Sequence, residues 1–121
     1  MGDKKVLVVE DQEDMRLLYR VMFRRETRIE VLEAESGESA LSIVAQEVPD
    51  LILTDITLPG MSGIDLTRIV KRDFPAMKVM VITGHDASRF YDQAMNAGAD
   101  DLVIKGDMAQ IVAAAKKLIG I

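Results

Sequence analysis

The chain alternates short apolar runs with longer segments of helical period, and this alternation constrains the fold more than any other feature of its 121 residues. The apolar runs are rich in β-branched residues, which is typical of strands. They cover residues 6–9, 29–33, 51–54, 78–82 and 102–104. The segments of helical period cover residues 13–25, 37–46, 63–73, 87–97 and 107–118. Three of the runs are apolar almost throughout, as expected for strands that are covered on both faces.

Five strands that alternate with five helices predict an α/β fold, with a mostly parallel sheet and helices on both of its faces. At this length the most common solution is the flavodoxin-like doubly wound sheet, with strand order 2-1-3-4-5. We therefore expect one domain over residues 1–121. Ligands of such sheets bind beyond the carboxyl ends of the strands, where the first and third strands meet.

Apolar residues at helical spacing predict which helix faces pack on the sheet. For segment 13–25 the expected residues are Met15, Leu18, Met22 and Phe23, and for segment 87–97 they are Phe90, Tyr91, Ala94 and Met95.

Composition excludes several classes of function. The net charge of −5 argues against nucleic-acid binding by this chain, because Lys and Arg supply most of the affinity for phosphates. There is no cysteine, and therefore no disulfide or cysteine-based metal site. No apolar run is long enough to span a membrane, and the N-terminus has no apolar secretion signal. These features predict a cytoplasmic protein.

Polar side chains follow four of the predicted strands directly. Glu10 and Asp11 follow the first strand, Asp55 the third, Thr83 the fourth and Lys105 the fifth. The carboxyl ends of parallel strands lie at one edge of the sheet, so we expect these five side chains to meet. Three clustered carboxylates require positive charge, which Lys105 and a divalent cation would supply. Mg²⁺ is the expected cofactor, because it prefers carboxylate oxygens and water and commonly acts on phosphates.

This set of groups predicts phosphoryl chemistry. A carboxylate beside Mg²⁺ can attack phosphorus and form an acyl phosphate, and we assign that role to Asp55 at the end of the central strand. Glu10 and Asp11 are expected to hold the metal, with Asp11 as a direct ligand. Lys105 and Thr83 would stabilise the phosphoryl oxygens.

Glu13 and Asp14 have a different expected role. They fall in the first turn of the predicted helix 13–25, where carboxylates interact favourably with the helix dipole.

At these residues the chain resembles the receiver domains of two-component response regulators. The resemblance covers essentially the whole chain and lies in "LVVEDQED", "PDLILTDITLPGMSGIDL", "VMVITGHD" and "GADDLVIKG". It implies that Asp55 is the phosphoacceptor, that Glu10 and Asp11 bind Mg²⁺ and that the backbone carbonyl of Thr57 is a further ligand. It also implies that Thr83 is the switch hydroxyl and that Lys105 contacts the phosphate.

The resemblance also implies partners. The phosphoryl donor would be a sensor histidine kinase or a histidine phosphotransfer protein. The signal would pass to a downstream protein or output domain through the surface of segments 87–97, 102–104 and 107–118. A second copy of the chain is left open as a partner. Whether the chain acts alone or belongs to a longer protein is left open too.

Two positions depart from the family pattern. Leu102 stands where family members commonly have an aromatic residue that rotates on activation. Gly106 follows the lysine where they commonly have a proline after a cis peptide bond, so we expect the loop to take another path. His85, near Thr83, is expected to be a solvated loop residue; the alternative is that it flanks the phosphoryl group with Thr57 and tunes hydrolysis.

Three other functions are compatible with parts of this pattern. A flavin-binding electron carrier needs phosphate-binding residues after the first strand, where this chain has acids. A phosphatase with an aspartyl nucleophile, of the haloacid-dehalogenase type, has a second acid two residues after the nucleophile, where this chain has Thr57. A pseudo-receiver scaffold that is not phosphorylated stays open because of Leu102 and Gly106. We therefore expect a phosphoacceptor, not an enzyme beyond its own phosphorylation and slow dephosphorylation.

Overall fold

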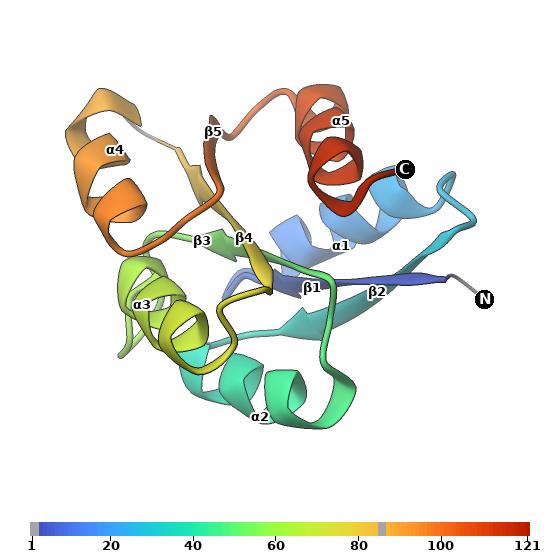
Figure 1. The fold of residues 1–121 in the computed structure, drawn as a ribbon. Coiled ribbons are helices and arrows are strands. Elements are labelled where there is room, and N and C mark those ends of the chain that lie inside the picture. Colours follow the sequence, from blue (N-terminus) through green and yellow to red (C-terminus); the bar gives the residue numbers. More distant parts are fainter. Residues whose placement is uncertain (1–2, 85–86) are drawn as a thin grey trace.

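The computed structural model describes residues 3–84 and 87–121, which form a five-stranded parallel sheet between two layers of helices (Figure 1). In chain order the elements are β1 (Lys4–Val9), α1 (Glu13–Phe23), β2 (Ile29–Ala34), α2 (Gly37–Glu47), β3 (Leu51–Asp55), α3 (Gly63–Asp73), β4 (Lys78–Thr83), α4 (Ala87–Asn96), β5 (Asp101–Ile104) and α5 (Met108–Ile119). The strand order is β2-β1-β3-β4-β5, and every pairing between these strands is parallel. The predicted fold class and strand order are confirmed.

The sheet separates two apolar cores. Helices α2, α3 and α4 cover one face, and α1 and α5 cover the other (Figure 1). The central strands contribute alternate residues to each face: Leu7 and Ile52 to the first core, Val8 and Leu53 to the second. All four of these side chains are almost completely buried, which explains why the sequence of these strands is apolar without alternation.

For α1 and α4, the prediction of which residues pack on the sheet is wrong at one residue each. Leu18 is 41% exposed, because Tyr19 and Phe23, four residues apart, form the buried face of α1 instead. Tyr91 is 51% exposed, and Ala94 is the fully buried residue of α4. Both helices carry apolar residues on more than one side, so periodicity alone did not identify the buried side.

Two helices begin in the same way. Ser36 caps α2 by accepting a hydrogen bond from the Ser39 backbone N–H, and Ser62 caps α3 by accepting one from Asp65. In each case the residue after the serine is a buried glycine. No helix within the described residues has the length and apolar character needed to cross a membrane.

Helix α2 ends at a strained residue. Val48 adopts φ 45° and ψ 68°, a left-handed conformation that is unfavourable for a β-branched side chain, and it is 59% exposed. We expect Val48→Asn to raise the free energy of unfolding by about 0.5–1 kcal/mol, because asparagine tolerates this conformation. Urea denaturation measures the change. Val48→Ala removes the same exposed apolar surface without that tolerance, so a larger gain with alanine would contradict the explanation.

Candidate functional site

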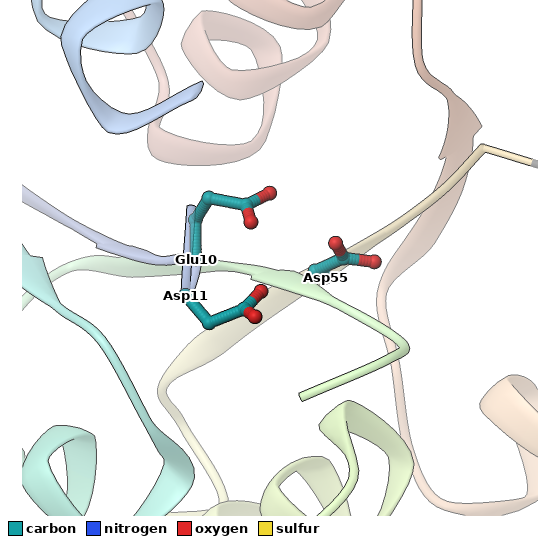
Figure 2. A group of neighbouring side chains, drawn as sticks. All are labelled: Glu10, Asp11 and Asp55. Carbon is teal, nitrogen blue, oxygen red and sulfur yellow. The ribbon is translucent and has the colours of Figure 1, made fainter. Parts of the chain in front are cut away.

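The acidic side chains at the carboxyl ends of β1 and β3 lie close together at one edge of the sheet. Val9 pairs with Thr54, so Glu10 and Asp11 leave β1 directly beside Asp55, the last residue of β3. Figure 2 shows the three side chains, which come from two neighbouring strands. A carboxylate oxygen from each lies within 4.8 Å of one from each of the others. The predicted cluster of three acids is therefore present.

Lys105, the residue after β5, joins this cluster. Its Nζ lies 2.7 Å from Asp55 Oδ2 and 3.2 Å from Glu10 Oε1, and so forms an ion pair with both acids. Burial lowers the pKa of the Lys105 ammonium, but its hydrogen bonds and the charges of Asp55 and Glu10 outweigh this and hold the pKa above its usual value. Lys105 therefore stays protonated at neutral pH.

Glu10 is the most buried acid of the cluster, with 1% of its surface exposed. Burial raises the pKa of its carboxyl group, as does the charge of Asp55. The backbone N–H of Gln12, which donates to Glu10 Oε2 at 3.0 Å, and Lys105 act in the opposite direction. Crowding and burial thus disfavour the charged form of Glu10, and added positive charge would relieve this.

Thr83 and Thr57 are the two predicted threonines of the site. Thr83 ends β4, is 2% exposed, and its carbonyl accepts a hydrogen bond from the Lys105 backbone N–H at 2.8 Å. Thr57 is exposed, and its backbone N–H donates to Asp55 Oδ1 at 3.3 Å. The role of the Thr57 carbonyl as a metal ligand stays a prediction.

The other predicted residues divide as follows. Glu13 and Asp14 lie in the first turn of α1, as expected, and are exposed. His85 lies outside the described residues. Gly106 has φ 117°, which glycine adopts readily, and the described residues contain no cis peptide bond. Leu102 is partly buried against the core of α2, α3 and α4.

The structure adds residues that the sequence analysis did not identify. Arg16 Nη1 donates to the Glu10 carbonyl at 2.7 Å and thereby fixes the acidic turn to α1. Its Nε also lies 3.6 Å from Glu33 Oε1 on β2. Tyr19 lies buried beneath the site, and burial, together with the charges of Glu10 and Asp55, raises the pKa of its hydroxyl. The sequence shows only that an arginine stands six residues after Glu10, which does not by itself predict this contact.

The carboxylate oxygens of the cluster are suitable ligands for a hard divalent cation. The three carboxylates and the single ammonium of Lys105 have a formal charge of −2 when all are ionised. Carboxylate oxygens at this spacing are the ligands that Mg²⁺ and similar ions prefer in proteins. The cluster of Glu10, Asp11 and Asp55 can therefore bind a metal ion.

Comparison with known proteins agrees with this geometry. Residues 6–116 match the family model described as "Response regulator receiver domain". The response regulator protein VraR of Staphylococcus aureus is 33% identical over 110 residues, which are 90% of this chain and 53% of VraR. The chain thus spans about half the length of the curated relatives that it matches.

Two solved structures show the same fold at a similar level of identity. A two-component response regulator of the LuxR family from Aurantimonas sp. SI85-9A1 has a TM-score of 0.90 and 30% identity, covering 96% of this chain and 84% of that one. The response regulator TrrA from Thermotoga maritima, solved in complex with Mg²⁺-BeF, has a TM-score of 0.86 and 30% identity, covering 95% and 98%.

Proposed function

The chain belongs to the family of response regulator receiver domains of two-component systems, and from this membership we propose that it accepts a phosphoryl group on Asp55. The observation that carries the proposal is the position of Lys105 Nζ, between Asp55 Oδ2 at 2.7 Å and Glu10 Oε1 at 3.2 Å. An ammonium at this point offsets the charge of the nucleophile's neighbours and lies where phosphoryl oxygens need a cation.

The proposed step moves one phosphoryl group. A carboxylate oxygen of Asp55 attacks the phosphorus of a phosphohistidine, a P–O bond forms, and the P–N bond to the imidazole breaks. The departing imidazole nitrogen keeps the electron pair of that bond and takes up a proton. Lys105 donates to an oxygen of the transferred group, and the Thr83 hydroxyl, at the end of the adjacent strand, donates to another. The acyl phosphate returns to the carboxylate by slow hydrolysis.

Mg²⁺ is the proposed cofactor, held by Glu10, Asp11 and Asp55, with the Thr57 carbonyl as a further ligand. When bound, it neutralises charge on the phosphoryl oxygens. Asp11 is less buried than Glu10 and is the better direct ligand, whereas Glu10 already accepts hydrogen bonds from Gln12 and Lys105. The Mg²⁺-BeF complex of TrrA, a relative with the same fold, supports this proposal.

Substitution of neighbouring acids tests the metal site. We expect Asp11→Asn to weaken Mg²⁺ binding by about 10-fold or more, because it removes a charged ligand. Asp14→Asn, three residues away in the exposed first turn of α1, should bind Mg²⁺ like the wild type. Isothermal titration calorimetry measures both constants. Equal weakening in the two variants would show that only the general negative charge matters.

The phosphoacceptor proposal is tested with a small phosphodonor. Wild-type protein incubated with acetyl phosphate and Mg²⁺ should gain the mass of one phosphoryl group and lose it in hydroxylamine, which cleaves acyl phosphates. EDTA should prevent the gain. Borohydride reduction followed by peptide mapping should locate the modification at residue 55. No gain in mass, or a modification stable to hydroxylamine, would contradict the proposal.

We also propose partners for this chemistry. The donor is a sensor histidine kinase or a histidine phosphotransfer protein, as family membership implies. The output is a downstream protein or domain that binds the surface of α4, β5 and α5. On that surface Leu102, Tyr91 and Ser88 help to line a groove of about 380 Å³. The proposed location is the cytoplasm, with no nucleic-acid or membrane partner for this chain.

The phosphatase alternative is less well supported. A second acid that protonates a leaving group is expected two residues after the nucleophile, and Thr57 stands there, exposed and with its backbone N–H donating to Asp55. The receiver family supports a phosphoacceptor instead of an enzyme in the usual sense.

A further inference from the structure

The turn between β1 and α1 carries two of the three acids, and no helix cap fixes it. Gln12, the residue before α1, makes no capping hydrogen bond with its side chain, whereas serines cap α2 and α3. The Asp11 carboxylate is also weakly restrained, because its Oδ2 lies 3.3 Å from Nε2 of the exposed Gln12 side chain. The direction of the Asp11 side chain therefore depends on the backbone of the turn.

The Arg16 side chain holds that backbone. Its Nη1 donates to the Glu10 carbonyl at 2.7 Å, and this carbonyl belongs to the peptide bond that joins Glu10 to Asp11. The register of β1 with both of its neighbours ends at Val9, so the Glu10 carbonyl lies beyond the paired part of the sheet. A peptide group is planar, so a contact that fixes its oxygen also fixes the nitrogen and Cα of Asp11. A charged donor makes this contact a strong hydrogen bond.

Glu33 on β2 restrains Arg16 in turn. Arg16 Nε lies 3.6 Å from Glu33 Oε1, and Arg20 Nε lies 2.7 Å from the other oxygen, Oε2. Glu33 is followed by Ala34, whose carbonyl accepts a hydrogen bond from the Glu10 backbone N–H at 3.0 Å. The Arg16 side chain is only 16% exposed, so it lies between α1 and β2 and not on the solvent side of the helix. These contacts tie β2, α1 and the acidic turn together.

We propose that Arg16 is a positioning residue for the metal site. It holds the peptide between Glu10 and Asp11 in the orientation in which both carboxylates lie close to Asp55. This role rests on the Mg²⁺ site proposed above, and it adds a residue that acts through the backbone of two ligands without contacting the metal. Groups that orient metal ligands in this way commonly determine much of the metal affinity.

The charge of Arg16 gives the two possible effects of its removal opposite signs. A guanidinium beside the acidic cluster repels Mg²⁺, so loss of the charge alone would strengthen Mg²⁺ binding. Loss of the contact that orients Glu10 and Asp11 would weaken it. We expect Arg16→Gln, which removes both, to weaken Mg²⁺ binding by about 10-fold. Isothermal titration calorimetry of the metal-free chain measures the constant, and thermal melting in EDTA shows that the variant is folded.

Arg20→Gln is the matched control. Arg20 lies one turn further along α1 and forms the shorter ion pair with Glu33, but within the described residues it forms no contact with the acidic turn. Its side chain is 45% exposed, and exposed ion pairs contribute little. The variant removes the same charge from the same helix, so its Mg²⁺ affinity should stay within about 2-fold of the wild type.

Two further measurements separate positioning from a general loss of stability. In EDTA, NMR order parameters of the Asp11 and Gln12 amides should fall in Arg16→Gln, whereas that of Asp55, on β3, should not change. With acetyl phosphate, the Mg²⁺ concentration that gives half the maximal rate of phosphoryl uptake should rise by about 10-fold. The rate at saturating Mg²⁺ should return to that of the wild type, because the reacting groups are intact.

Each contrary result has a distinct meaning. An Arg16→Gln chain that binds Mg²⁺ as tightly as the wild type, or more tightly, would overturn the role of Arg16 and leave the metal site intact. Equal weakening in Arg20→Gln would also overturn it, because the ion pairs of α1 and not the contact with Glu10 would then matter. A wild-type chain that binds no Mg²⁺ would overturn the proposed metal site, and the role of Arg16 with it.

Discussion

An Asp55→Ala chain is expected to gain no phosphoryl group from acetyl phosphate and Mg²⁺ under conditions in which the wild type is modified. The expectation is a complete loss, because the substitution removes the nucleophile itself and not a group that assists it. Glu10, which shares Lys105 with Asp55, is an alternative carboxylate, but it is 1% exposed and accepts hydrogen bonds from Gln12 and Lys105. Intact-mass spectrometry over a time course measures the uptake.

Asp100→Ala provides the matched control for this experiment. Asp100 also pairs with a lysine, Lys71 at 3.0 Å, and accepts a hydrogen bond from the Val79 backbone N–H, but it lies near the opposite edge of the sheet. Its substitution disturbs a similar ion pair without touching the acidic cluster, so this variant should be modified at the wild-type rate. Equal uptake by the Asp55→Ala chain would show that another residue is the acceptor.

The position of the predicted site follows from the sequence because all strands of a parallel sheet end at the same edge. Once the runs before Glu10, Asp55 and Lys105 are identified as strands of one parallel sheet, the residues that follow them must lie at the same edge of that sheet. The strand register confirms this, with Val9 beside Thr54 and Thr83 beside Ile104. No knowledge of side-chain contacts was needed, and the same reasoning explains why the fold class and strand order were correct.

The errors and omissions have a different physical origin. Helix α1 carries apolar residues on more than one side, so its periodicity did not show that Tyr19, and not Leu18, faces the sheet. The contact of Arg16 with the Glu10 carbonyl depends on the angle at which α1 leaves β1, which no pattern in the sequence encodes. Such details are set by tertiary packing and become visible only in the structure.

Gly63 is another residue whose importance the sequence did not reveal, and it leads to a second large expected effect. Its N–H donates to the Ile56 carbonyl at 2.8 Å, which brings the start of α3 against the backbone that follows β3. A Cβ at this position would overlap the carbonyl oxygen of Asp55 and lie 2.8 Å from its carbonyl carbon. These are backbone atoms of the phosphoacceptor itself, and they cannot move without displacing it.

We therefore expect Gly63→Ala to lower the free energy of unfolding by about 2–4 kcal/mol, although alanine is normally favoured over glycine in helices by about 1 kcal/mol. Gly37→Ala is the matched control, because Gly37 is likewise the first residue of a helix that a serine caps. There the added Cβ would meet only the flexible side chain of Met61, with Sδ at 2.9 Å, so the change should be within about 1 kcal/mol of zero. Urea denaturation in EDTA measures both variants. A similar loss in the two would show that the close approach of α3 to Asp55 is not what requires glycine at position 63.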